Sequence, residues 1–229
     1  DDGVNIRAKY KSPFGTDRLR RNYGDDARSE VIFDAAGNII LASCTQSANF
    51  PVKDPSNSAQ ASFGGGLQDG VVLKFNSNFS NYLYGTFFGG SGDDACFVAS
   101  ISPNTNTIFI AGGTTSNNLP GNKTGVIYSG YRGGNTDGFI TQLKPDSLGI
   151  IKTSYLGTSA ADIVYGLKFD KAGFPYVMGT TEGSWPILNA AFSNPGSSQF
   201  ISKLAPDFSR FIYSTVFGTG SSVPNISPI

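Results

Sequence analysis

Short runs of alternating apolar and polar residues, rich in β-branched and aromatic side chains, recur along the chain between clusters of turn-forming residues. Alternation with a period of two predicts β-strands that bury one face. In the middle of the chain four such runs follow one another, at about residues 96–101, 107–113, 138–143 and 150–156. We therefore expect an all-β fold with four antiparallel strands in this unit.

The same succession of landmarks occurs three times, which indicates an internal repeat. An acidic residue opens each unit at equal spacing, in the pairs Asp26-Ala27, Asp94-Ala95 and Asp162-Ile163. A large apolar residue then precedes proline, in the pairs Phe50-Pro51, Leu119-Pro120 and Trp185-Pro186. We divide the chain into a basic leader or linker at 1–22, three repeats at 23–91, 92–159 and 160–221, and the start of a further repeat at 222–229.

Four antiparallel strands in each repeat are typical of a β-propeller blade. The turn between the first two strands fits this interpretation, because residues 34–38 and 170–173 have glycine where hairpins need positive φ. The second repeat departs from it and has residues 102–106, Ser-Pro-Asn-Thr-Asn, instead. A four-stranded sheet has two faces that stacking buries, and propellers have about 4 to 8 blades. We therefore expect a partial β-propeller of about three four-stranded antiparallel blades, part of a larger propeller.

The composition removes most common catalytic machinery. The chain has 0 His, which excludes Ser-His-Asp triads, Cys-His pairs and imidazole metal sites. Its 17 Lys and Arg balance 17 Asp and Glu, so no overall field would attract nucleic acid. No apolar run approaches the roughly 20 residues of a membrane span. Cys44 and Cys96 either form one disulfide or stay as two buried thiols, and we favour the thiols.

Further motifs accompany these landmarks: FDAAGN at 33–38, TQSANFP at 45–51, DGV at 69–71 and YLYGTFFGGS at 82–91. Together they resemble the bacterial SBBP repeat family, the "seven-bladed β-propeller" repeat, over about residues 23–221. The resemblance implies a secreted or surface-displayed bacterial protein, often a cargo of the type IX secretion system associated with gliding motility or adhesion. It implies no catalytic residue and no particular ligand. The third repeat departs from the family pattern, because Ser198-Gln199 replaces the Asp-Gly pair.

One segment suggests a metal site. Residues 89–97 loosely fit a calcium-binding nonapeptide, with Asp93 and Asp94 as ligands. Such sites need tandem copies, and the equivalent stretches at 22–26 and 158–162 break the pattern. The alternative is a turn between blades in which the aspartates accept hydrogen bonds from nearby backbone amides. Calcium is thus the only cofactor that the sequence suggests, and otherwise we expect none.

The connections between the second and third strands are long, at about residues 46–68, 115–136 and 181–198. Loops of about 20 residues exceed ordinary hairpin connections and are often functional. In the second repeat this loop carries three residues of types enriched at binding hot spots, Tyr128, Tyr131 and Arg132. We expect an edge that binds a protein or a glycan there. The alternative is that Tyr128 folds back as a plug over the sheet, as we expect of the apolar residues that precede proline.

These observations favour a non-catalytic extracellular binding or scaffold module of a larger bacterial cell-surface or secreted protein. Its partner would be a protein at the cell surface or in the secretion machinery, or a glycan, and we expect neither nucleic acid nor a membrane span. One alternative is a polysaccharide lyase or glycosidase that uses Asp26, Asp94 and Asp162, although residues repeated in every blade are usually structural. The other is a structural spacer in a giant adhesin.

Overall fold

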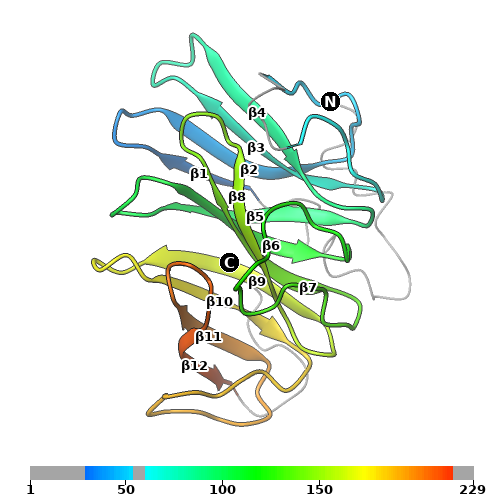
Figure 1. The fold of residues 1–229 in the computed structure, drawn as a ribbon, viewed down its shortest axis with the longest axis vertical. Helices are drawn as coiled ribbons and strands as arrows, with labels where there is room; N and C mark the ends of the chain where they lie inside the picture. Colours follow the sequence, from blue (N-terminus) through cyan, green and yellow to red (C-terminus); the bar gives the residue numbers. More distant parts are fainter. Residues whose placement is uncertain (1–28, 54–59, 219–229) are drawn as a thin grey trace.

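The computed structural model describes residues 29–53 and 60–218, and within these ranges every regular element is a β-strand. The strands form three four-stranded antiparallel sheets in chain order (Figure 1), which we call blades 1, 2 and 3. Blade 1 consists of β1 (Glu30–Phe33), β2 (Ile39–Thr45), β3 (Asp69–Phe75) and β4 (Tyr82–Phe88). Blade 2 consists of β5 (Asp94–Ile101), β6 (Ile108–Thr114), β7 (Asp137–Leu143) and β8 (Ile150–Leu156). Blade 3 consists of β9 (Asp162–Phe169), β10 (Pro175–Thr181), β11 (Gln199–Leu204) and β12 (Phe211–Phe217).

The expected all-β, propeller-like fold is confirmed, and the four strands of blade 2 begin and end within about two residues of the predicted positions. The turns between the first two strands follow the glycine rule in blades 1 and 3, where Gly37 has φ 76° and Gly173 has φ 85°. Blade 2 has no glycine in this turn, and Asn106 adopts the left-handed conformation with φ 56°. Asparagine tolerates this conformation better than most residues, so blade 2 forms the hairpin although its turn has no glycine.

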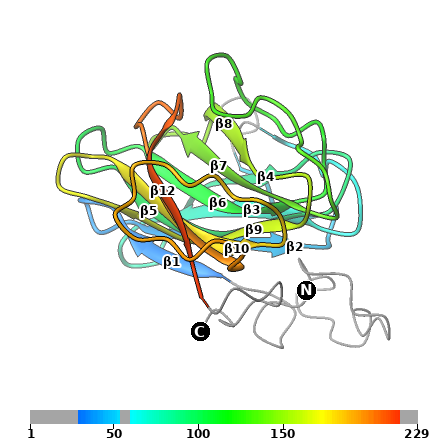
Figure 2. The same cartoon turned by 90° about the horizontal axis from the view of Figure 1, so that it is seen from below.

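The blades stack face to face, and the first strand of each blade packs on the sheet of the blade before it. Strand β5 packs across β1, β2 and β3, and β9 packs across β5, β6 and β7. In the view from below the sheets overlap one another (Figure 2), as neighbouring blades do. One hydrophobic cluster, with Ile40, Val72 and Ile110, joins blades 1 and 2, and another, with Phe109, Ile140 and Val164, joins blades 2 and 3. We call these two contacts the first and the second junction.

The apolar residues that precede proline cover the sheets as plugs, as expected. Leu119 is 1% exposed, and its backbone N–H donates to the hydroxyl of Tyr155 at 2.9 Å. Trp185 stacks on Phe200 with ring centroids 3.5 Å apart, and its indole N–H donates to Ser202 at 3.0 Å. The equivalent Phe50 meets the ring of Phe87 edge-on at 5.3 Å. At these three residues the long loops therefore lie against their own sheets.

The turn between the last two strands of each blade presents one large apolar residue in a left-handed conformation. Leu148 has φ 57° and Phe208 has φ 62°, and both side chains are 0% exposed against the preceding blade. The ring of Phe208 lies 5.5 Å from that of Phe109 in blade 2. Phe79 holds the same position in blade 1 with φ 57°, yet it is 65% exposed. Within the described residues no blade precedes blade 1, and the side chain has nothing to enter.

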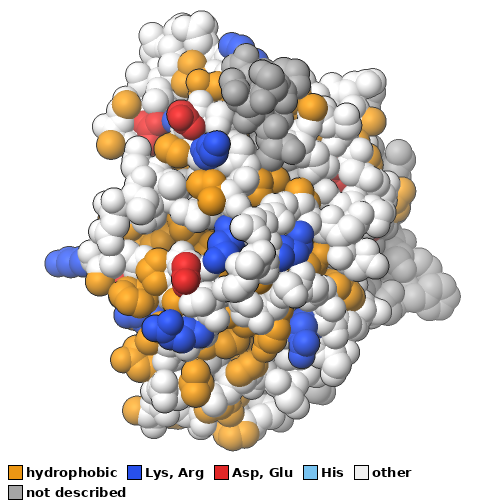
Figure 3. All heavy atoms as spheres, viewed as in Figure 1, with side chains coloured by type: hydrophobic (Ala, Val, Ile, Leu, Met, Phe, Trp, Pro, Cys, Tyr) orange, Lys and Arg blue, Asp and Glu red, His pale blue; other side chains and the backbone are white. Residues whose placement is uncertain are grey.

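The outward face of blade 3 likewise has no neighbouring blade among the described residues. Met178 and Ile201 lie opposite each other in the register of β10 and β11 and are 38% and 39% exposed. The equivalent pair in blade 2, Ala111 and Ile140, is fully buried under blade 3. Hydrophobic side chains accordingly reach the surface at the blade 3 end of the molecule (Figure 3). No described residue covers this face.

The two cysteines are free thiols and both are buried, which confirms the favoured alternative. Burial raises the pKa of the Cys44 thiol to about 12. The predicted basic leader at 1–22, the segment at 222–229 and Asp26 lie outside the described residues. In the described part of the chain no helix has the length and apolarity to cross a membrane.

Candidate functional site

Buried aspartates fasten the loops of blade 1 to the start of blade 2 at the first junction. Asp69 opens β3, is 0% exposed, and accepts the backbone N–H of Gly64 at 2.6 Å. Asp94 opens β5, is also 0% exposed, and accepts the backbone N–H of Gly90 at 2.7 Å. A Cβ on Gly89 would stand 2.3 Å from Asp69 Oδ1 and 2.8 Å from Asp94 Oδ2, so the two carboxyl groups lie together above this glycine.

The second junction repeats this arrangement with the residues of the next two blades. Asp137 accepts the backbone N–H of Arg132, and Asp162 accepts the backbone N–H of Thr158 at 2.6 Å. A Cβ on Gly157 would stand 2.2 Å from Asp137 Oδ1, as at Gly89 in the first junction. The two junctions therefore share one backbone framework, in which a pair of buried carboxyl groups holds two loops in place.

These carboxyl groups are shifted toward their neutral forms. Burial raises the pKa of Asp69 to about 7, and the nearby charge of Asp94 adds to the effect. Burial, with a smaller contribution from Asp162, likewise raises the pKa of Asp137 to about 7. One oxygen of each of these two groups, Asp69 Oδ1 and Asp137 Oδ1, is buried without a hydrogen-bond partner in the described structure. A proton on one member of each pair reduces the cost of burying two like charges together.

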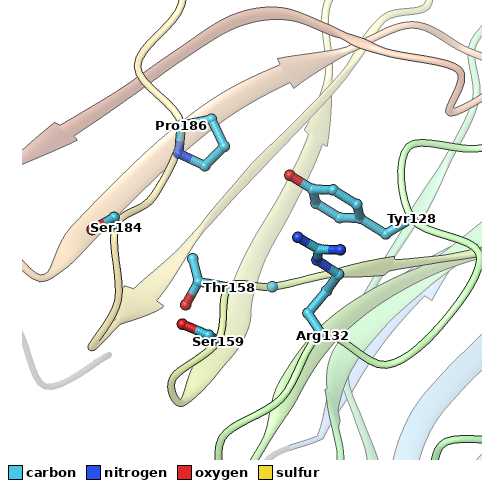
Figure 4. Close-up of a pocket in the computed structure, with 7 residues that line it drawn as sticks. Tyr128, Arg132, Thr158, Ser159, Ser184 and Pro186 are labelled. Atoms are coloured by element: carbon cyan, nitrogen blue, oxygen red, sulfur yellow. The ribbon is translucent and has the colours of Figure 1, made fainter.

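The junctions differ in the side chains that this framework carries. In the first junction Gln60 reaches down to the framework, where its Oε1 accepts the N–H of Gly89 at 2.9 Å. Its counterpart in the second junction is Tyr128, because both residues bond to the fourth strand of their own blade. The carbonyl oxygen of Gln60 accepts the N–H of Phe87 at 3.1 Å, and that of Tyr128 accepts the N–H of Tyr155 at 3.0 Å. Tyr128 does not fill the corresponding space: its ring lies beside the guanidinium of Arg132 (Figure 4), and both residues line a pocket together with Gly157.

Three more matched positions carry different residues in the two junctions, and at each the first junction is the more closed. The residue whose N–H reaches the first carboxyl group is Gly64 in one junction and Arg132 in the other. Counting back from proline, Asn118 of blade 2 corresponds to Ser184 of blade 3. Asn118 Oδ1 closes the first junction by accepting the N–H of Ser91 at 2.9 Å, and the shorter Ser184 forms no such bridge.

The fourth change places Thr158 where the first junction has Gly90. A Cβ on Gly90 would stand 2.4 Å from Asn118 Oδ1, so the first junction has no room for a side chain there. In the second junction the Thr158 hydroxyl donates to Asp162 at 2.8 Å, a bond that Ser116 makes to Asp94 at 2.7 Å in the first. Thr158 and Ser116 thus make the same bond in the two junctions, although Asp94 Oδ1 also accepts from Thr114 while Asp162 Oδ1 has no partner among the described residues. In the second junction the side chains at the changed positions border an opening.

A pocket of about 230 Å³ lies at the second junction. Its walls come from three segments: the long loop of blade 2, the turn that enters β9, and the loop after β10 (Figure 4). No acidic side chain is among its lining residues, which are Tyr128, Arg132, Gly157, Thr158, Ser159, Ser184 and Pro186.

The structure brings two of the three predicted binding residues together in this pocket. The guanidinium Cζ of Arg132 lies 4.5 Å from the centroid of the Tyr128 ring. Tyr131 does not line the pocket; it packs edge-on against Tyr155 at 6.2 Å, as Phe63 packs against Phe87 at 5.9 Å in blade 1. Tyr131 is therefore half-buried and part of the blade, and Tyr128 is neither a plug nor fully free.

Sequence reasoning missed the other side of the pocket. Thr158, Ser159, Ser184 and Pro186 come from blade 3 or its entry turn, and the sequence does not say which loops of neighbouring blades meet. A signal was present nonetheless: aligned on the repeated aspartates, Gly64 and Arg132 occupy the same place in their units, and so do Gly90 and Thr158. A change at matched positions of a repeat marks a place where one junction differs from the other.

The structure places Asp93 and Asp94 in the turn between blades 1 and 2. Asp93 Oδ1 accepts the N–H of Leu67 at 2.6 Å, and Asp94 accepts hydrogen bonds from Thr114, Ser116 and Gly90. Across the described ranges no group of three or more His, Cys, Asp or Glu side chains is arranged to hold a metal ion. The hydrogen bonds agree with the turn interpretation, and calcium binding stays a prediction.

No protein-family model and no curated protein matches this sequence. The junctions, compared with each other, are therefore the main guide to function.

Proposed function

We propose that this chain is a non-catalytic extracellular binding module built of propeller blades, and that its partner binds in the pocket at the second junction. The SBBP-like repeats support a place in a larger secreted or surface-displayed bacterial protein, of the kind that the type IX secretion system exports for gliding or adhesion. The partner is then a glycan or a protein of the cell surface.

One observation carries the proposal: the same framework is closed in one junction and open in the other. Residues that serve only to stack blades are expected to recur, since every junction has the same task. Tyr128 and Arg132 replace Gln60 and Gly64 without changing the backbone hydrogen bonds around them. The replacement places a half-buried tyrosine and an exposed arginine at the pocket, two residue types that are common at binding hot spots.

The buried aspartates argue against the alternative of a glycosidase or lyase. A glycosidase uses two carboxyl groups that flank the bond to be cleaved, and a lyase that uses one of these aspartates as its base needs that carboxylate within reach of a substrate proton. Asp94 and Asp162 do stand at matching positions, but they are 0% and 1% exposed and accept backbone N–H groups. A substrate has no access to them, which supports a structural task for the repeated carboxylates.

A test compares the chain with a variant that carries the blade 1 residues, Tyr128→Gln with Arg132→Gly. Immobilised capsular polysaccharide and immobilised outer-membrane proteins of a gliding bacterium serve as two separate probes. We expect the wild-type chain to bind one of them and the variant to lose at least tenfold in affinity. A control with Lys171→Ala and Arg210→Gln, two exposed cations on turns of blade 3, should bind like the wild type.

The melting temperature of each variant separates loss of binding from loss of fold. Equal binding by wild type and the double variant would refute the pocket as the site. Absence of binding to both probes by the wild-type chain would instead favour the spacer alternative.

A further inference from the structure

The pocket at the second junction carries the positive charge of Arg132, which also acts on the buried carboxyl group of Asp137 behind the pocket wall. Arg132 is exposed, and among the described residues its guanidinium forms no ion pair. The lining includes no carboxylate that would neutralise it. The lysines that face carboxylates elsewhere show the contrast: Lys74 pairs with Asp34 at 2.9 Å and Lys203 with Asp170 at 2.7 Å. A negatively charged ligand group is therefore the natural complement of Arg132.

Arg132 is also held in one orientation. Its backbone N–H donates to the buried Asp137, and its guanidinium stacks on Tyr128, whose own backbone is bonded to β8 on both sides through Tyr155 and Ser154. Figure 4 shows the guanidinium next to the Tyr128 ring, on the opposite side of the space from Thr158 and Ser159. A guanidinium stacked on an aromatic ring keeps its planar edge free and matches the two oxygens of a carboxylate. The geometry thus suits a carboxylate better than a diffuse anion.

The opposite wall offers hydroxyl groups. Ser159 and Ser184 are exposed, and neither hydroxyl has a hydrogen-bond partner among the described residues. The Thr158 hydroxyl donates to Asp162 and accepts the backbone N–H of Ala160 at 3.1 Å, so one lone pair remains for a ligand hydroxyl. The hydroxyl of Tyr128 points into the same space (Figure 4). Groups that both donate and accept, placed around a small ring-sized space, are suited to the hydroxyls of a sugar.

The size of the pocket limits what enters it. At about 230 Å³ it is smaller than the roughly 300–1,000 Å³ typical of sites for drug-sized ligands. One ring with one charged substituent fills such a space, and the rest of a longer ligand would extend over the open rim. The wall formed by Pro186 and the edge of Tyr128 gives such a ring an apolar side to lie against.

From this combination we propose that the pocket binds a uronic acid residue of an acidic polysaccharide, with its carboxylate on Arg132 and its ring hydroxyls on Ser159, Ser184 and Thr158. This inference rests on the proposed function and names its ligand class. A protein ligand would present a carboxylate from an Asp or Glu side chain or from its C-terminus, and such a group has no ring hydroxyls for the opposite wall.

Calorimetric titration of the whole chain at pH 7.5 and low salt tests the inference with defined probes. Digalacturonate and diglucuronate are the acidic probes, and their methyl esters and neutral disaccharides are the controls. We expect binding of an acidic probe, at least tenfold weaker binding of its methyl ester, and at least tenfold weaker binding by Arg132→Gln. Arg210→Gln, which removes one positive charge from an exposed turn of blade 3, should leave the affinity unchanged.

The possible failures are distinguishable from failure of the proposed function. Equal affinity for acid and ester, or for wild type and Arg132→Gln, overturns the uronate inference. Tighter binding of a short peptide with a free C-terminal carboxylate than of any sugar also overturns it, and so does equal displacement by inorganic phosphate. In each of these cases pocket-dependent capture of outer-membrane proteins or polysaccharide would still uphold the proposed function.

Discussion

The two junctions of this chain have the same framework and different contents. In each, two buried aspartates accept backbone N–H groups from two loops, and an aromatic residue of the long loop packs edge-on against the fourth strand. The first junction is then filled by Gln60 and bridged by Asn118. The second has Tyr128 and Ser184 at these places and keeps a pocket of about 230 Å³.

The difference separates structural from functional residues within a single sequence. What both junctions share is needed to stack one blade on the next, and what differs is free to serve a ligand. Each position at the second junction can therefore be compared with the matched position at the first, whose residue shows what stacking of the blades alone requires.

The largest effect is expected from the apolar residues that enter the preceding blade. Phe208→Ala should lower the free energy of unfolding by about 3–5 kcal/mol and Leu148→Ala by about 2–5 kcal/mol, because both side chains are fully buried. Phe79→Ala, at the exposed equivalent, should cost at most about 1 kcal/mol. Urea unfolding measures all three. A cost at Phe79 as large as at Phe208 would show that blade 1 is packed differently from this account.

The shared carboxyl pairs predict a pH dependence of stability. The pKa of Asp69 and of Asp137 is about 7 in the folded chain and near 4 in the unfolded one, so the folded state holds these protons more tightly. The stabilisation is complete below about pH 4 and is lost as the pH rises to 7, by up to about 1.4 kcal/mol for each pH unit and each group. Urea unfolding at pH 5 and pH 8 should show lower stability at pH 8.

Single replacements show whether both junctions contribute to the pH dependence of stability. Asp69→Asn and Asp137→Asn should each flatten the difference between pH 5 and pH 8 by a similar amount, since each removes one titrating group and keeps an oxygen acceptor for the loop N–H. A change at only one of them would break the equivalence of the two frameworks.

A smaller effect distinguishes the closed junction from the open one. Gly64→Ala should cost about 1–3 kcal/mol, because a Cβ there would stand 2.4 Å from the carbonyl oxygen of Gly90. Arg132→Ala, at the matched position, should cost about 0.5 kcal/mol or less, since that side chain is exposed. Thermal unfolding of the two variants side by side is sufficient. An equally small cost at Gly64 would show that the first junction has room for a side chain there, which would contradict its closure.

The fold followed from the sequence because local signals agreed. Alternation placed the strands of blade 2, glycine marked the turns at Gly37 and Gly173, and the residues before proline became plugs. The site followed only in part. Tyr128, Tyr131 and Arg132 were predicted as binding residues from their types and their place in a long loop, but Tyr131 packs in the blade. The wall with Ser159 and Ser184 depends on how far one blade is rotated against the next, and no pattern within a single repeat encodes that rotation.

The central claim is that the second junction binds a ligand and the first does not. Two-dimensional amide NMR of the ¹⁵N-labelled chain during titration with digalacturonate tests it directly, because both junctions are observed in one sample. The account predicts shifts at the amides of Arg132, Thr158 and Ser159, with the matched amides of Gly64, Gly90 and Ser91 unchanged. Shifts of similar size at both junctions, or shifts confined to the first, would contradict it.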